Sequence, residues 1–148
     1  MQQLNLPHYK FKIKNKENKP FIFDIVRKKY VALSPEEWVR QHIVHFLVEE
    51  KKYPISLIAI EKKILVNSLT KRPDILIFGK NGTSFIIVEC KSAQIPLNQN
   101  VFDQIARYNL ALNATFLMVS NGLEHYYCSM DHKNEQYSFL EELPDYVK

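Results

Sequence analysis

The amino-acid sequence predicts an α/β domain in which a mixed β-sheet is flanked by helices. Two β-branched runs surround an Asn-Gly pair at residues 81–82, which is the strongest short signal for a β-hairpin. The sequence SPEE at residues 34–37 supplies an N-cap serine, a proline at the first helical position and acids in the first turn, so a helix is expected to begin there. A second helical pattern with one apolar face follows the hairpin at residues 101–112.

The length of 148 residues favours one domain spanning residues 1–148, with a core at about residues 34–130. A chain of this size buries roughly 70% of its unfolded surface and needs no metal or disulfide to fold. No apolar run approaches the roughly 18–20 residues of a membrane helix, and the N-terminus lacks the apolar segment of an export signal. We therefore expect a cytoplasmic protein with no membrane partner.

The net charge and the spacing of the cysteines and histidines indicate which kinds of ligand the chain can bind. The net charge of +4 and the pI near 9.0 permit binding to a polyanion without requiring it. Cys90 and Cys128 lack the spacing of metal ligands, and the five histidines are scattered, so a zinc site is not expected. Two unpaired cysteines fit a reducing compartment.

Residues 9–33 are expected to form an N-terminal β-hairpin with a lysine-rich outer face. Apolar and lysine positions alternate over residues 9–14, and a polar turn at residues 15–20 separates them from a second β-branched run. These lysines either contact phosphates or protect an exposed sheet edge from aggregation. The sequence leaves both roles open.

The first helix is expected over residues 35–51. Its apolar stripe predicts which of two acids, Glu36 or Glu37, faces the core. The stripe consists of Val39, Ile43, Phe46 and Leu47. Glu36 falls on this stripe at helical spacing, whereas Glu37 points off it. Further strands are expected at residues 57–66, 114–120, 122–130 and 136–140.

The Asn-Gly turn fixes which residues of the hairpin lie opposite each other. If residues 81 and 82 are the two turn residues, the numbers of cross-strand partners sum to 163. Asp74 then pairs with Glu89, and Lys91 lies on the same face because side chains alternate along a strand. Leu76, Phe78, Phe85 and Ile87 share the face of the acids, whereas Ile75, Ile77, Ile86, Val88 and Cys90 take the other face.

Asp74, Glu89 and Lys91 are the candidate chemical group. Opposed residues carry Cβ atoms roughly 4.5–5.5 Å apart, so the two carboxylates repel each other unless a cation lies between them. Mg²⁺ prefers hard oxygen ligands, and a divalent ion polarises a phosphodiester and lowers the pKa of bound water. An adjacent lysine can orient the nucleophile or offset phosphate charge. The alternative is a structural ion pair between Lys91 and one acid, and the residues alone leave both open.

The same residues resemble a known motif. RPD, a strand, a turn and VECK resemble the PD-(D/E)xK nuclease motif. Its positions are occupied by Pro73, Asp74, Glu89 and Lys91. On the following helix, Gln104 and Tyr108 resemble the Q-x-x-x-Y motif of RecB-type members. Because these two residues stand four apart, they share a helix face and can point at one site.

Over about residues 21–144 the chain is similar to the N-terminal nuclease domain family of type I restriction enzyme R subunits, including its small stand-alone members. The resemblance implies a restriction-endonuclease-like fold and cleavage of DNA that depends on Mg²⁺ or Mn²⁺. Asp74 and Glu89 would hold the metal, and Lys91 would position the attacking water. Gln104 and Tyr108 would support the lysine and the phosphate.

An acid on the helix before the sheet often joins the metal site in this family. The sequence EEWVR at residues 36–40 matches that place. Glu36 is the expected third ligand because it lies on the core-facing stripe, and Glu37 is the alternative. Glu61 is a further candidate acid, although an exposed strand glutamate flanked by lysines is the simpler account. Arg40 and Gln41 can approach the site from the helix, but capping and surface hydrogen bonds explain them equally well.

The chain departs from that family in one respect. R subunits carry an ATP-driven translocase after this domain, whereas this sequence contains no G-x-x-x-x-G-K-[ST] phosphate loop. Loading onto DNA is therefore expected to be supplied by a separate translocase or specificity protein, by a homodimer, or not at all. Two functions are supported: a metal-dependent DNA endonuclease or nuclease module, and a non-catalytic nucleic-acid-binding or regulatory subunit with a nuclease-like fold.

Overall fold

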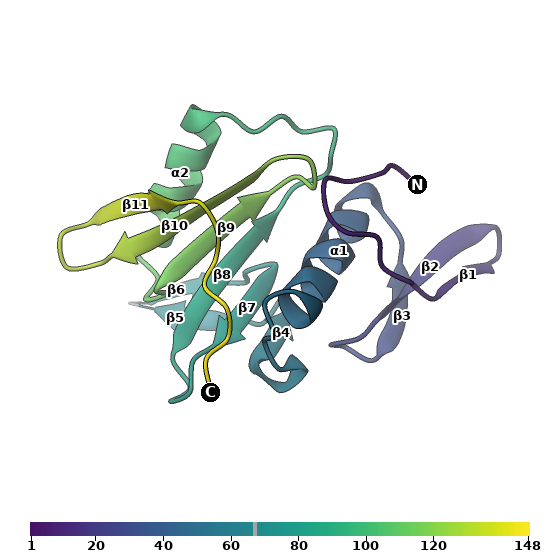
Figure 1. Ribbon diagram of the computed structural model, residues 1–148, viewed down its shortest axis with the longest axis horizontal. Coiled ribbons are helices and arrows are strands. Elements are labelled where there is room, and N and C mark those ends of the chain that lie inside the picture. The colour runs from purple at the N-terminus through teal and green to yellow at the C-terminus, as the bar shows by residue number, and fades with distance from the viewer. Residues whose placement is uncertain (67) are drawn as a thin grey trace.

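A computed structural model describes residues 1–66 and 68–148 (Figure 1). Within these residues the helices are α1 (Pro35–Glu49), α2 (Gln99–Asn109) and the short 3₁₀ helix η1 (Ile55–Leu57). The strands are β1 (Ile13–Lys16), β2 (Lys19–Asp24), β3 (Lys29–Ala32), β4 (Ile58–Ile60), β5 (Ile64–Val66), β6 (Leu69–Lys71), β7 (Ile75–Phe78), β8 (Ser84–Cys90), β9 (Phe116–Ser120), β10 (His125–Asp131) and β11 (Gln136–Leu140).

The central sheet has six strands in the order β11-β10-β9-β8-β7-β4. β8 and β9 run parallel, and the other neighbours run antiparallel. α2 lies in the connection between the parallel pair, because parallel strands cannot be joined by a tight turn. α1 packs on one face of the sheet and α2 on the other (Figure 1). The predicted fold class, a mixed sheet flanked by helices, is confirmed.

The core consists of two apolar layers, one on each face of the sheet. Ile86 and Val88 belong to the layer under α1, whereas Ile87 belongs to the layer under α2 together with Phe102. All four side chains are fully buried. This division follows from the alternation of side chains along β8, and it explains why the strand reads as a continuous apolar run.

The register predicted for the β7–β8 hairpin is confirmed beside the two acids. Ile75 pairs with Val88 and Leu76 with Ile87, so the numbers of partners sum to 163. The predicted two-residue turn is wrong. The Gly79 N–H donates to the Thr83 carbonyl at 2.7 Å, so the loop closes over residues 79–83 instead.

A β-bulge restores the register that this longer loop would otherwise shift. Phe78 pairs with Ser84, whereas Ile77 pairs with Ile86, so Phe85 has no partner on β7. Phe85 therefore turns to the α1 side of the sheet, where the centre of its ring lies 5.3 Å from the ring centre of Phe116. The prediction that Phe85 shares the face of the acids is wrong for this reason.

The N-terminal segment forms a three-stranded sheet, β1-β2-β3, rather than a single hairpin. The predicted hairpin is present as β1 and β2, which turn at Glu17 and Asn18 with positive φ angles. The return strand does not continue as predicted, because Asp24 closes a second turn. Its Oδ1 atom accepts hydrogen bonds from the N–H groups of Val26 and Arg27 at 2.7 and 2.8 Å.

The hairpin also begins later than predicted. Tyr9 and Phe11 precede β1 and pack on α1 instead of forming a strand face. The centre of the Phe11 ring lies 4.7 Å from the ring centre of His42 and 5.3 Å from that of Trp38. The apolar alternation in this segment thus reflects contacts with a helix.

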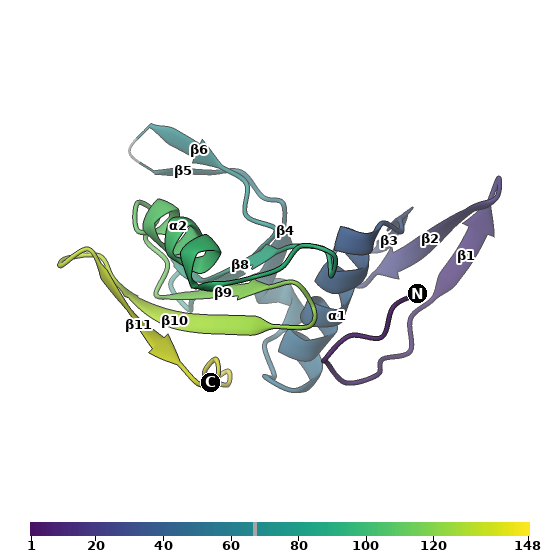
Figure 2. The same ribbon diagram turned by 90° about the horizontal axis from the view of Figure 1, so that it is seen from above.

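The single strand predicted over residues 57–66 is wrong. The chain breaks at Glu61, which has a φ of +51°, and forms β4 and β5 as separate strands. β4 stays in the central sheet beside β7, whereas β5 pairs, among the described residues, only with β6. The β5–β6 hairpin consequently extends away from the sheet (Figure 2).

The remaining elements agree with the sequence to within a few residues. α1 ends two residues before the predicted helix, and α2 covers residues 99–109 where 101–112 was predicted. β9, β10 and β11 occupy the three predicted C-terminal strands. Within the two described ranges, no helix is both long enough and apolar enough to cross a membrane.

Ile87→Ala should destabilise the fold by about 3 kcal/mol, because it leaves a cavity between the sheet and α2. Leu65→Ala removes a β5 side chain that is 72% exposed and should change the free energy of unfolding by less than about 0.5 kcal/mol. Equilibrium unfolding in urea measures both values. Equal losses in the two variants would contradict the two-layer core.

Candidate functional site

Asp74 and Glu89 lie side by side where β7 begins and β8 ends. The hairpin register places them opposite each other, since Ile75 pairs with Val88. The Asp74 Oδ2 atom accepts a hydrogen bond from the Cys90 backbone N–H at 2.7 Å. This bond holds the Asp74 carboxylate against β8, next to the Glu89 side chain.

Glu89 carries an oxygen that lacks a compensating contact. Its Oε1 atom is buried and has no hydrogen-bond partner in the described part of the chain. Burial, together with the negative charge of Asp74 and a hydrogen bond to it, raises the pKa of Glu89 to about 7, while Lys71 and Lys91 oppose the shift. The two carboxyl groups therefore resist carrying two negative charges at once.

A cavity of about 220 Å³ opens beside Glu89. It brings together side chains from β6, β8, the segment after β8, and α2. Among its lining residues are Lys71, Glu89, Lys91, Gln104 and Tyr108. Four of the five residues that the motif resemblance singles out as catalytic thus line one cavity, and the fifth, Asp74, adjoins Glu89.

α2 presents Gln104 and Tyr108 to this cavity. The helix begins at Asn98, whose Oδ1 atom accepts a hydrogen bond from the Val101 N–H at 2.9 Å. Phe102 faces the sheet and is fully buried, so residues 104 and 108, one turn apart, lie on the side of the helix that borders the cavity. Both side chains are exposed and accessible to a ligand.

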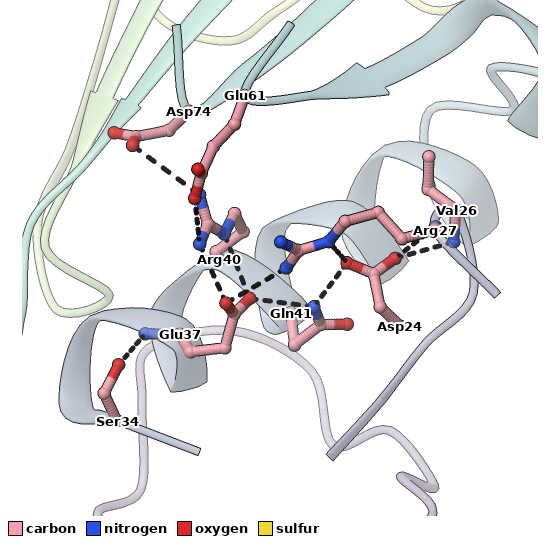
Figure 3. Close-up of polar contacts among 9 residues, drawn as sticks. All are labelled: Asp24, Val26, Arg27, Ser34, Glu37, Arg40, Gln41, Glu61 and Asp74. Carbon is pink, nitrogen blue, oxygen red and sulfur yellow. Dashed lines mark hydrogen bonds and ion pairs between the residues drawn. The ribbon is translucent and has the colours of Figure 1, made fainter. Parts of the chain in front are cut away.

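Arg40 of α1 connects the acids to a buried network of ion pairs (Figure 3). Its Nη1 atom lies 3.7 Å from Asp74 Oδ1, and its Nη2 atom lies 2.9 Å from Glu61 Oε1. Its Nε and Nη2 atoms also donate to the two carboxylate oxygens of Glu37 at 3.0 and 2.8 Å. This two-point contact orients the guanidinium so that its positive charge lies between Glu37 and Asp74.

Glu37 is the centre of that network. Its N–H donates to the Ser34 Oγ atom at 3.0 Å, which is the predicted N-cap of α1. Its carboxylate accepts hydrogen bonds from Arg27 at 3.0 Å and from Gln41 at 2.9 Å. Burial alone would raise the pKa of Glu37, but the hydrogen bonds from Arg40 and Gln41 outweigh burial and lower it. Glu37 is therefore ionised at neutral pH.

The network ends at Asp24 of β2. Asp24 Oδ2 accepts from Arg27 Nε at 2.6 Å and from Gln41 Nε2 at 3.1 Å (Figure 3). Burial would raise the pKa of Asp24, but its bonds to Arg27 and Gln41 lower it. The N-terminal sheet is in this way joined to α1 by charged contacts.

Glu36 does not face the core, so that part of the prediction is wrong. α1 is covered by the N-terminal sheet as well as by the central sheet, and the arginines of this environment bury Glu37 and leave Glu36 exposed. Burial, followed by the negative charge of Asp74, raises the pKa of the Cys90 thiol, while Arg40 opposes the shift.

The third metal ligand stays a prediction. In residues 1–66 and 68–148, no three His, Cys, Asp or Glu side chains form a group that could hold a metal ion. Glu61, the other candidate acid, is occupied by its ion pair with Arg40. The two acids that lie together are Asp74 and Glu89.

Lys71 belongs to the site but is missed by sequence reasoning. Its Nζ atom lies 3.3 Å from the centre of the Tyr108 ring, and its side chain lines the cavity. A lysine three residues before Asp74 is visible in the sequence. What the sequence does not reveal is the break at Glu61, which creates the hairpin that ends at Lys71.

The Asp74–Glu89 pair fits a divalent cation. Two carboxylates adjoin, and one buried oxygen has no partner in the part of the chain that the structure describes. Hard oxygen ligands of this kind suit Mg²⁺ or Mn²⁺. The alternative, a structural ion pair of Lys91 with either acid, is not formed within the described residues. Lys71 and Lys91 act on Glu89 through their charge without forming an ion pair with it in these residues.

Glu89→Gln should stabilise the protein above about pH 7 and leave its stability nearly unchanged at pH 4.5 or below. In the wild type, the unfolded Glu89 ionises near pKa 4.5, whereas the folded one keeps its proton up to about 7. The free energy of unfolding therefore falls as the pH rises through this window, by a loss on the order of 3 kcal/mol. Urea unfolding at pH 4.5 and pH 8 measures the difference, with Glu141→Gln as an exposed control. Parallel pH profiles for wild type and Glu89→Gln would refute the burial of this charge.

Comparison with known families identifies the domain. Residues 35–144 match the family described as type I restriction enzyme R protein N terminus (HSDR_N), which is 110 of the 148 residues. Among curated proteins, no sequence matches the chain. The crystal structure of a candidate nuclease belonging to DUF820 from Anabaena variabilis ATCC 29413 is similar over 93% of this chain and 80% of that chain, with 12% identity and a TM-score of 0.47. Because the family match covers well over half of the sequence, the chain belongs to the type I restriction enzyme R protein N-terminus family.

Proposed function

We propose that the protein is a metal-dependent DNA nuclease of the PD-(D/E)xK type, acting alone or as the nuclease module of a restriction or DNA-processing assembly. The observation that carries this proposal is the Asp74–Glu89 pair, whose Glu89 Oε1 atom is buried without a partner in the described ranges. Membership in the family of restriction enzyme R proteins supports it. Within such an assembly, loading onto DNA would come from a separate translocase or specificity protein, or from a second copy of the chain.

Each residue of the site has a role in this proposal. Asp74 and Glu89 would hold Mg²⁺ or Mn²⁺, which polarises the phosphodiester and lowers the pKa of bound water. Lys91 lines the same cavity, and its ammonium would orient the attacking water or offset charge on the phosphate. Gln104 would hydrogen-bond to the lysine or the phosphate from α2. Arg40, 3.7 Å from Asp74, would keep that carboxylate oriented.

The distribution of charge supports DNA as the partner. Residues 9–33 contain eight Lys and Arg and two Asp and Glu, which is a net charge of +6. The rest of the chain contains 12 Lys and Arg and 14 Asp and Glu, which is a net charge of −2. The positive charge is thus concentrated in the N-terminal sheet and the segment that leads into it. A concentrated basic surface of this kind is typical of proteins that bind nucleic-acid phosphates.

One face of the N-terminal sheet combines lysines with aromatic rings. Lys12 lies opposite Phe23, with its Nζ atom 5.5 Å from the ring centre, and Lys14 Nζ lies 4.0 Å from the ring centre of Tyr30. Lys12, Lys14 and Lys16 repeat every second residue, which is roughly 6.6 Å along an extended chain. That spacing is about twice the 3.4 Å rise per phosphate of one DNA strand. The face would contact phosphates without reading sequence.

Replacing Lys12, Lys14 and Lys16 together by Gln should weaken binding to a fluorescein-labelled DNA duplex in EDTA by at least about tenfold. The slope of log K against log salt should also fall by about 0.9 for each phosphate that the variant no longer neutralises. Fluorescence anisotropy over a salt series measures both quantities. The matched control replaces three exposed lysines of other surfaces by Gln, namely Lys80, Lys133 and Lys148. An equal effect of the two triple variants would show that only total charge matters and would reject this surface.

Wild-type protein with Mg²⁺ or Mn²⁺ should nick or linearise supercoiled plasmid, and Lys91→Ala and Asp74→Ala should each slow cleavage by at least about 100-fold. The reason is that each variant removes a charged group of the proposed site. Agarose electrophoresis over time measures the rates, and thermal unfolding checks that the variants fold. Lys80→Ala, in the loop at the far end of the same hairpin, is the control. Equal cleavage activity in wild type, Lys91→Ala and Asp74→Ala would contradict the proposed nuclease function.

A non-catalytic DNA-binding or regulatory subunit is the second candidate. The observation that favours it is the cationic surrounding of the acids, with Arg40 at 3.7 Å from Asp74 and two lysines lining the cavity. Such a subunit would bind DNA with strong salt dependence and would be indifferent to Mg²⁺ and to Lys91→Ala. Metal-dependent cleavage at stoichiometric protein that is lost in Lys91→Ala excludes it.

A further inference from the structure

The β5–β6 hairpin brings a second lysine, Lys71, to the cavity. Within residues 1–66 and 68–148 its two strands pair only with each other, so the hairpin belongs to neither of the larger sheets. Lys71 pairs with Ile64 at the base of this hairpin, and the chain reaches Asp74 three residues later. The cavity therefore has lysines from two separate segments, Lys71 from the hairpin and Lys91 from the end of β8.

The ammonium of Lys71 lies over the face of the Tyr108 ring, 3.3 Å from its centre. Tyr108 is 55% exposed, so its ring is not needed to fill the core. Lys71 forms no ion pair with any carboxylate of the described residues. An ammonium placed on an aromatic face is attracted by the electron density of the ring, and this contact orients both side chains.

The charges around Lys71 leave its ammonium available for an anion. Burial lowers the pKa of Lys71, Lys91 acts in the same direction, and Glu89 and Asp74 oppose them. A partly desolvated ammonium at a cavity wall has lost water without gaining a carboxylate partner. Phosphate oxygens are suitable acceptors for such a group.

We propose that Lys71 binds a backbone phosphate of the DNA strand that occupies the cavity, and that Tyr108 positions Lys71 through the face of its ring. This inference rests on the proposed nuclease function, because that function supplies the phosphate. It also changes the role of Tyr108. The resemblance assigns Tyr108 directly to the lysine and phosphate of the motif, whereas the geometry makes it a positioning residue for a lysine outside the motif.

Binding of a fluorescein-labelled DNA duplex in EDTA, followed by anisotropy over a salt series, tests the inference. Lys71→Ala should weaken binding several-fold and reduce the slope of log K against log salt by about 0.9, as expected when one phosphate is no longer neutralised. Lys71→Arg keeps the charge and should restore the slope. Lys63→Ala removes an exposed lysine that precedes the same hairpin and should leave the slope at the wild-type value.

Tyr108 variants separate the ring from the hydroxyl. Tyr108→Ala should weaken binding, and Tyr108→Phe, which keeps the ring, should restore it. The double variant Lys71→Ala/Tyr108→Ala should bind no more weakly than Lys71→Ala alone, because the tyrosine acts through the lysine. Additive losses, or binding by Tyr108→Phe as weak as that of Tyr108→Ala, would overturn the positioning role. An unchanged salt slope in Lys71→Ala would overturn the phosphate contact.

The outcome is independent of cleavage, because EDTA removes divalent ions. Coupled losses in Lys71 and Tyr108 variants of a protein that never cuts DNA would reject the nuclease function and leave the phosphate contact standing. Conversely, metal-dependent cleavage together with equal salt slopes in Lys71→Ala and Lys63→Ala would keep the function and reject this inference.

Discussion

The hydrogen bond from the Cys90 N–H to Asp74 Oδ2 depends on one register of one hairpin, and the candidate site depends on that bond. A shift of β8 by one residue would move every side chain of the strand to the other face of the sheet. Glu89 would then enter the layer under α1, and Cys90 would take its place beside Asp74. Both apolar layers would be disrupted at the same time, so the core enforces the register that brings the acids together.

Arg40 extends this constraint from the sheet to α1. Its guanidinium is fixed by two hydrogen bonds to Glu37, and one of its nitrogens lies near Asp74. Removing one member of a buried ion pair leaves an uncompensated charge and typically costs about 3–5 kcal/mol, so this network is well suited to hold a rigid position. Through Arg27 the same network reaches Asp24 in the N-terminal sheet. The most basic surface of the protein is therefore joined to the acids by charged contacts as well as by the chain.

What could be predicted from the sequence depended on whether the signal was local. Alternation and the Asn-Gly position predicted the pairing of Ile75 and Leu76 correctly, although the turn itself is longer. The longer loop pairs Phe78 with Ser84 instead of Phe85, and the extra residue of the bulge at Phe85 returns the pairing to the predicted register. The helical spacing of Gln104 and Tyr108 was also a local signal, and both residues line one cavity with Glu89.

The predictions that were wrong or incomplete, for Glu36 and Lys71, have a common cause: both residues are positioned by tertiary contacts. Glu36 lies on the apolar stripe of its helix, but Arg27, in the turn after β2, and Arg40 on α1 pair with the next residue, Glu37, which is the buried acid. Lys71 ends a hairpin that follows a break in the strand at Glu61, where the backbone has a positive φ that is uncommon for glutamate and not signalled by residue type. Periodicity describes one element at a time and carries no information about either event.

The positions of Lys71 and Lys91 help to distinguish a structural ion pair from a cation site at Asp74 and Glu89. A structural ion pair would bring Lys91 or Lys71 into contact with a carboxylate, and in the described residues neither lysine makes such a contact. Arg40 approaches Asp74 alone, so Glu89 Oε1 stays without a partner there. Lys71 and Lys91 offset the charge of Glu89 only in part, and a metal ion bound as proposed would compete with the proton of Glu89 near its pKa of about 7. If the pair holds a metal ion as proposed, that binding would strengthen as the pH rises through neutrality, whereas a structural pair of charges would not respond to pH in this range.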